Sequence, residues 1–185
     1  FLTLYPCNES RPLAANVNYQ PGGNYPNAVV ATLDPSGKTC IYTKSATHIV
    51  ADVNGYVPAG ASPATVSPAR ILETRPGEST VDGQAQGQGV VPANGVVELQ
   101  VAGRAGVPAD ADAAMLNVTA VFPGANGFLT LYPCNESRPL AANVNYQPSG
   151  NYPNAVLAKL DPSGKTCIYT KSATHIVADI NAYVP

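Results

Sequence analysis

Hydrophobic and polar residues alternate with a period of two along most of the chain, which is the pattern of half-buried β-strands. In the stretch HIVADINAY, this alternation places Ile176, Ala178, Ile180 and Ala182 on one face of a strand. No stretch sustains a helical period. The alternating segments predict strands over residues 70–74, 96–101, 113–121, 128–132, 140–147, 155–160, 166–170 and 175–183.

Segments rich in Pro, Gly, Asn and Asp separate these strands. PGANG precedes Phe128, QPSGNYPN follows Tyr146, and DPSGK is a hairpin signal in which Pro sets its own φ and Gly accepts a positive φ. Short strands joined by such turns are typical of an all-β antiparallel β-sandwich, which is the fold we expect. The similar segments MLNVTAV, AANVNYQ and VADINAY make a β-trefoil or three-sided β-prism the alternative, although their spacing is uneven.

The chain contains a near-exact internal repeat. When it is aligned with itself at an offset of 127 residues, 53 of 58 positions are identical. Such likeness points to a recent duplication or to recombination, as in tandem arrays of surface proteins. We therefore interpret residues 1–58 as the C-terminal half of a preceding repeat unit, 59–67 as a linker and 68–185 as one complete unit. We also expect the chain to be a segment of a longer array.

The composition adds few charged groups to this picture. Only 12% of the residues are charged and the formal net charge is -2. There is therefore no basic patch that would bind nucleic acid. No apolar run approaches the ~18 residues that a membrane helix requires. We expect neither a nucleic-acid partner nor insertion into a membrane.

Four cysteines lie at Cys7, Cys40, Cys134 and Cys167, and 33 residues separate the two members of each pair. Structural zinc sites use closely spaced ligand pairs, which this sequence lacks, so we expect no metal site. The simplest interpretation is two disulfides, Cys7–Cys40 and Cys134–Cys167, and hence an extracellular or cell-surface protein. Cross-pairing between the copies, or four buried free thiols in a cytosolic protein, are the alternatives.

The histidines give little reason to expect catalysis. His48 and His175 are one position in two copies, and in SATHIVAD an aspartate follows four residues later. That spacing spans about 13 Å of strand, which is too far for a hydrogen bond along it. Nothing resembles a nucleophile elbow, a phosphate-binding loop or the paired carboxylates of a glycosidase. We expect no catalytic residue, no cofactor and no enzymatic activity.

Four residues are candidates for contact with a ligand or neighbour. Arg70 and Arg75 flank Glu73 in ARILETRPG, so a structural salt bridge is the first interpretation and contact with an anion or glycan carboxylate the second. Tyr25 and Tyr152 lie in Pro-, Gly- and Asn-rich segments, where they would stack on sugar rings or contact another subunit. The alternative is that these tyrosines fill the rim of the core.

The order of several short motifs resembles a known repeat. ARILETRPG, MLNVTAVFPGANGFLTLYPC, PLAANVNY and KTCIYTKSATHIVADINAYV follow one another in residues 68–185, and all but the first and the start of the second recur in 1–58. This run resembles a tandem-repeat β-domain of secreted and cell-surface proteins of high-GC Gram-positive bacteria. The resemblance implies an extracellular, disulfide-containing β-domain, appended to hydrolases or strung in arrays. It implies no catalytic residue.

These observations predict a structural role. We expect an extracellular tandem-repeat protein that forms a surface stalk, adhesin or filament, with identical repeat units or subunits as partners. The alternative is a glycan- or cell-wall-binding module of a secreted protein, with cell-wall glycan as the partner.

Overall fold

The computed structural model describes residues 1–58, 60 and 62–185. These form two compact units, Phe1–Ala51 (unit 1) and Asp52–Pro185 (unit 2). The regular structure in the described residues is entirely β-strand, and they include no helix able to cross a membrane. Residues 59 and 61, which belong to the predicted linker, lie outside the described residues.

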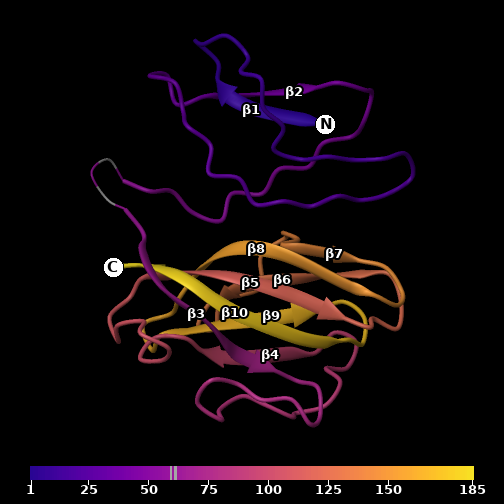
Figure 1. Ribbon diagram of the computed structural model, residues 1–185, viewed down its shortest axis with the longest axis vertical. Coiled ribbons are helices and arrows are strands. Elements are labelled where there is room, and N and C mark those ends of the chain that lie inside the picture. The colour runs from indigo at the N-terminus through magenta and orange to yellow at the C-terminus, as the bar shows by residue number, and fades with distance from the viewer. Residues whose placement is uncertain (59, 61) are drawn as a thin grey trace. The chain divides into compact units, whose positions relative to one another are not determined.

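Unit 2 contains two antiparallel sheets of four strands each, which is consistent with the predicted sandwich (Figure 1). The first sheet has the strand order β3-β10-β5-β8 and the second has the order β4-β9-β6-β7. The strands are β3 (Ala64–Glu73), β4 (Val96–Gln100), β5 (Ala113–Val121), β6 (Gly127–Pro133), β7 (Val144–Tyr146), β8 (Asn151–Lys159), β9 (Lys165–Thr170) and β10 (His175–Val184).

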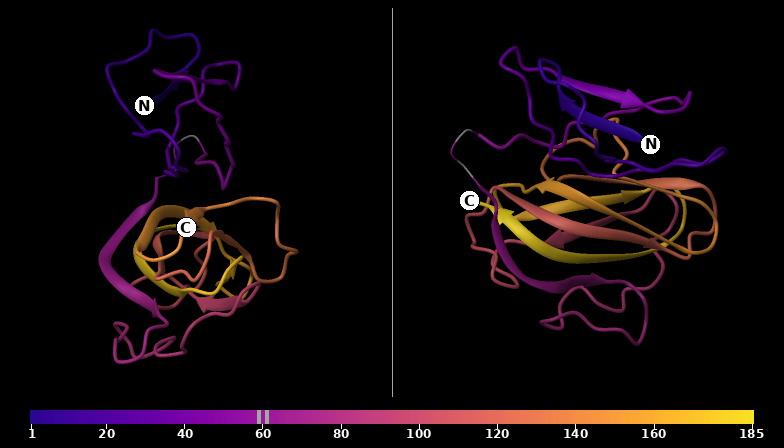
Figure 2. Two further views of the ribbon diagram at one scale, coloured as in Figure 1. Left: turned by 90° about the vertical axis from the view of Figure 1, so that its right-hand side faces the viewer. Right: turned by 45° about the horizontal axis from the view of Figure 1, so that its top comes forward.

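The two sheets of unit 2 face each other (Figure 2). Apolar side chains from both sheets form one core between them. The face of β10 predicted from alternation is buried, which confirms that prediction. Each fully buried Leu, Ile or Val contributes about 1.5–3 kcal/mol relative to an exposed one. The largest buried aliphatic side chains are Ile71, Leu72, Leu99, Val101, Leu116, Val118, Leu129, Val144, Ile168, Ile176 and Ile180.

Two strands of the first sheet begin earlier than the sequence pattern indicates. β3 starts at Ala64, inside the segment interpreted as a linker, and β8 starts at Asn151, inside the segment interpreted as a loop. Both strands contain a proline, Pro68 and Pro153 respectively, and both lie at an edge of their sheet. An edge strand tolerates proline because one side of it has no hydrogen-bonding neighbour.

Unit 1 contains one two-stranded antiparallel sheet, β1 (Leu2–Pro6) and β2 (Thr39–Thr43). Leu2 pairs with Thr43, and 127 residues later Leu129 of β6 pairs with Thr170 of β9, so the register is the same in both units. Residues 24–32 and 48–57, which correspond to β8 and β10, form no strand. In unit 2, β5 lies between β8 and β10 and pairs with both, and unit 1 has no counterpart of β5.

Candidate functional site

Both disulfides form within a single copy of the repeat. Cys7 is bonded to Cys40 and Cys134 to Cys167, and the Cα atoms of each pair are 4.9 Å apart. This confirms the predicted pairing against cross-pairing and against free thiols. Disulfides persist in oxidising surroundings, so the protein belongs to an oxidising environment of the kind found outside the cell.

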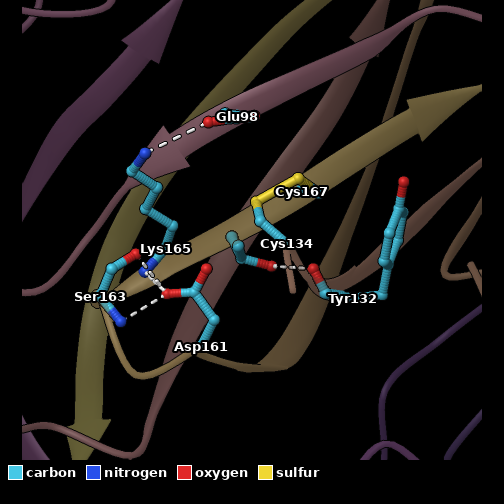
Figure 3. The surroundings of a disulfide bond; sticks show 8 residues. Glu98, Tyr132, Cys134, Asp161, Ser163, Lys165 and Cys167 are labelled. Carbon is cyan, nitrogen blue, oxygen red and sulfur yellow. Dashed lines mark hydrogen bonds and ion pairs between the residues drawn. A yellow bond between two sulfur atoms is a disulfide. The ribbon is translucent and has the colours of Figure 1, made fainter. Parts of the chain in front are cut away.

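The Cys134–Cys167 bond connects the end of β6 to the adjacent strand β9 (Figure 3). Tyr132 of β6 pairs directly with Cys167, and the Thr166 hydroxyl donates to the Tyr132 carbonyl oxygen at 3.3 Å. The bond therefore closes a loop whose two ends already meet in one sheet. It adds a covalent link between strands that are already paired, and the closed loop contains β7 and β8.

A capped turn precedes β9 next to this disulfide. Asp161 Oδ1 accepts hydrogen bonds from the Ser163 hydroxyl at 2.6 Å, the Ser163 amide at 2.8 Å and the Lys165 amide at 3.0 Å (Figure 3). These bonds, that of the Ser163 hydroxyl above all, hold the pKa of Asp161 below its ordinary value. The Lys165 ammonium also contacts Glu98 of β4 at 3.2 Å, which connects the turn to a second neighbouring strand.

Glu73, at the end of β3, is the centre of a cluster of charged side chains. Its side chain is fully buried, and Arg75 donates to both carboxylate oxygens, from Nε at 2.9 Å and Nη2 at 2.7 Å. Arg70 contacts Glu73 at 3.1 Å and also donates from Nε to Asp179 of β10 at 2.9 Å. Burial opposes ionisation of Glu73, but the hydrogen bonds and charges of the two arginines outweigh it and lower its pKa.

The arginine cluster thus places two of the four candidate contact residues among carboxylates of their own unit. Arg70 joins β3 to β10, and Arg75 lies just beyond the end of β3. The arrangement is that of an ion-pair network that fixes the edge strand β3 to its neighbour. Both guanidinium groups keep part of their surface exposed to solvent.

A second ion pair, in which only the arginine is buried, gave no signal in the sequence. Arg104 donates from Nε and Nη2 to the two oxygens of Asp82, each at 2.8 Å, and its Nη1 donates to the Gln100 carbonyl at 2.9 Å. Hydrogen bonds from Arg104 lower the pKa of Asp82 from 3.8 to about 2. Asp82 lies in a Gly- and Gln-rich segment that reads as a solvated loop, and 22 residues separate it from its partner.

The two candidate tyrosines lie in different surroundings although they are one position in two copies. Tyr25 is 43% exposed in unit 1. Tyr152 lies in β8, is half-buried and packs against the core of unit 2. The difference arises because β8 forms beside β5, whereas the corresponding segment of unit 1 has no such neighbour.

His175 has a structural contact with the end of β3. Thr74 Oγ1 accepts a hydrogen bond from the Ile176 amide at 2.9 Å and lies 3.1 Å from His175 Nδ1. The half-buried His175 ring therefore helps to position the end of β3 against β10, while His48 is exposed. Within the described residues there is no group of three His, Cys, Asp or Glu side chains that could hold a metal ion.

Comparisons of this chain with models of protein families, with curated proteins and with solved structures found no match.

Proposed function

We propose that this chain has a structural role in an extracellular tandem-repeat protein, where disulfide-bonded β-domains associate into a surface stalk, adhesin or filament. The observation that carries this proposal is the repetition of 53 of 58 residues together with the local contacts that those residues make. A chain that repeats its sequence, turns and disulfide from copy to copy is suited to building a regular assembly.

Several side-chain hydrogen bonds occur both in residues 1–58 and at the corresponding positions of residues 128–185. The Thr3 hydroxyl donates to the Ala14 carbonyl at 2.6 Å, and Thr130 does the same to Ala141 at 2.6 Å. The Tyr19 hydroxyl bonds the Thr43 hydroxyl at the end of β2, and the Tyr146 hydroxyl bonds the Thr170 hydroxyl at the end of β9. Asp34 and Asp161 each accept a turn-capping hydrogen bond from the amide two residues later. These contacts support the view that the two copies are versions of one building block.

The resemblance to repeats of high-GC Gram-positive cell-surface proteins, together with the two disulfides, supports an extracellular location for this building block. The paired β-strands offer edges through which neighbouring units could associate.

Electron microscopy of the secreted native material tests the proposal. We expect regular rods or fibres whose axial repeat corresponds to one 127-residue unit. Discrete single particles that bind peptidoglycan or a polysaccharide in a sedimentation assay would overturn it in favour of the second candidate.

That second candidate is a glycan- or cell-wall-binding module, and the exposed ring of Tyr25 is the observation that favours it. In a peptidoglycan sedimentation assay, Tyr25→Ala would then weaken binding at least about tenfold, while Thr32→Ala, another exposed position of unit 1, would leave it unchanged. Equal retention of both variants and of the unaltered chain would count against a binding role for Tyr25.

A further inference from the structure

Strands from the two halves of unit 2 are interleaved in space. We call residues 62–126 the front segment and residues 127–185 the back segment. The front segment supplies β3, β4 and β5, and the back segment supplies β6 to β10. β5 lies between β8 and β10, β3 pairs with the outer side of β10, and β4 pairs with the outer side of β9. Neither sheet is complete without strands of both segments.

Residues 1–58 repeat the back segment without a front segment, and the apolar positions that a front segment covers are exposed there. Leu33 is 56% exposed where Leu160 is 5% exposed, and Val50 is 87% exposed where Val177 is 4% exposed. Val53 corresponds to the fully buried Ile180 and is 92% exposed. The same kind of residue is thus a core residue in one copy and a surface residue in the other.

The charges of the two copies show the same difference. In unit 2, Asp179 accepts a hydrogen bond from Arg70 Nε at 2.9 Å, and Arg70 belongs to the front segment. Asp52 occupies the corresponding position of the first copy, is exposed and has no arginine beside it among the described residues; its Oδ2 accepts a hydrogen bond from the Ala142 amide at 3.2 Å. A front segment bound to residues 1–58 in the register of unit 2 would place an arginine against Asp52.

We propose that residues 1–58 are a docking surface for one further front segment, a polypeptide with the strand sequence of residues 62–126. Its β5-like strand inserts between residues 24–32 and 48–57, and its β3- and β4-like strands cover the two outer edges. The pairing follows from unit 2, where β5 pairs residue by residue with Asn151–Lys159 and with β10. This proposal rests on the proposed role as a tandem-repeat protein.

A second copy of this chain is not the occupant, because the numbers of segments do not match. Each 185-residue chain has one front segment (62–126) and two segments of the back type (1–58 and 127–185). The front segment already pairs with residues 127–185 in unit 2. If two such chains exchanged front segments, residues 1–58 of one chain would be completed, but residues 127–185 of the other chain would lose their partner. We therefore assign the docking surface to a front segment other than the one that unit 2 contains.

Hydrogen exchange on an extended chain tests this. Residues 62–127 are placed directly before Phe1, which reproduces the sequence at the junction of Gly127 and Phe128. We expect amide exchange in residues 24–33 and 48–57 to slow by at least about a hundredfold relative to the 185-residue chain, because these residues join a closed sheet. Peptides from the two copies differ in mass at Val30 and Val53, so each copy is read separately.

The matched control is the same extension carrying Leu116→Asp and Val118→Asp in the added segment only. Both side chains are fully buried in β5, so the altered segment should not dock and exchange should stay fast. Asp52→Asn in the extended chain should reduce the protection of residues 48–57, since it removes the partner of the added arginine.

Two results would overturn the proposal. One is fast exchange in residues 24–33 and 48–57 of the extended chain while circular dichroism shows that the added residues are folded. The other is slow exchange already in the 185-residue chain with a dimer in analytical ultracentrifugation, which would show that residues 1–58 pair with themselves. Microscopy of the native material decides the tandem-repeat role separately: missing fibres with positive exchange results would remove the filament and keep the docking.

Discussion

Asp82 and Glu73 show how single carboxylates stabilise unit 2 through arginine partners. Each carboxylate receives two hydrogen bonds from one guanidinium group, Asp82 from Arg104 and Glu73 from Arg75. Both pKa values are lowered, which means that each ionised carboxylate is more stable in the folded chain than in the unfolded one. Because Arg104 is almost fully buried, removal of its partner would leave a charge in the interior.

Replacement of Asp82 by Asn should destabilise unit 2 in a pH-dependent way. Because Asp82 is exposed and solvent weakens its ion pair, the lowering of its pKa from 3.8 to about 2 predicts that Asp82→Asn reduces the free energy of unfolding at pH 7 by only about 1 kcal/mol. A carboxyl group with a lowered folded pKa stabilises above its unfolded pKa and loses this effect as pH falls. The difference between Asp82→Asn and the unaltered chain should therefore shrink from about pH 4 down to about pH 2.

Urea unfolding followed by far-ultraviolet circular dichroism measures this, since the chain contains no Trp. Asp110→Asn is the matched control, because Asp110 is exposed and undergoes the same chemical change. A pH-independent difference for Asp82→Asn would mean that the charge of Asp82 does not contribute.

Replacement of Asn143 by Ala should also destabilise unit 2. Asn143 is buried and its Oδ1 accepts a hydrogen bond from the Leu131 amide at 2.7 Å. The variant leaves that buried amide without a partner, which costs about 1–3 kcal/mol. Asn16 makes the same bond to Leu4 at 2.8 Å but is only half-buried, so Asn16→Ala should have the smaller effect in denaturant titrations. Equal effects of the two variants would contradict the role given to burial.

At the scale of strands, the sequence pattern predicted the elements whose alternation is not interrupted. β5 has the predicted bounds, and β10 extends one residue beyond them. The pattern failed where proline occurs within a strand, as at Pro68 and Pro153, because proline reads as a turn unless the strand is known to lie at an edge. Edge position depends on which strands pair, and period-two alternation carries no information about pairing.

The Cys134–Cys167 disulfide connects β6 to β9 within one sheet and should stabilise unit 2. In the chain-entropy model, a closed loop of 33 residues stabilises by roughly 3–4 kcal/mol, so Cys134→Ser with Cys167→Ser should lower the free energy of unfolding of unit 2 by about that amount. The paired variant Cys7→Ser with Cys40→Ser is the control, and unit 2 should unfold as before. An unchanged midpoint of urea unfolding after loss of Cys134–Cys167 would show that this disulfide does not stabilise unit 2.

The ion pairs illustrate what sequence reasoning could and could not give about the candidate site. Arg70, Glu73 and Arg75 are close in sequence, so their cluster could be expected from ARILETRPG alone. Asp82 and Arg104 meet only because the chain between them folds back, and Asp179 reaches Arg70 from the far end of the chain. Contacts of that kind follow from the topology of the sheets, which the sequence pattern does not specify.

For the whole molecule, the two units should unfold in separate steps. Unit 1 has a single two-stranded sheet and many exposed apolar residues, whereas unit 2 has two four-stranded sheets around one core. Two-stranded sheets are marginal without further strands, so unit 1 should unfold at the lower urea concentration. Hydrogen exchange along the titration would assign each step to its unit. A single cooperative transition in which both units lose protection together would contradict this.

The pairing of β3 with β10 has a mechanical consequence. Ala64, at the start of β3, pairs with Tyr183, near the end of β10, so the chain enters and leaves the sandwich at the same end (Figure 1). A pull on both ends would separate these antiparallel strands one hydrogen bond after another, like a zipper, instead of loading all of them together in shear. In a stalk made of such units, tension would release β3 first and lengthen the stalk, which would behave as an extensible tether and not as a rigid rod.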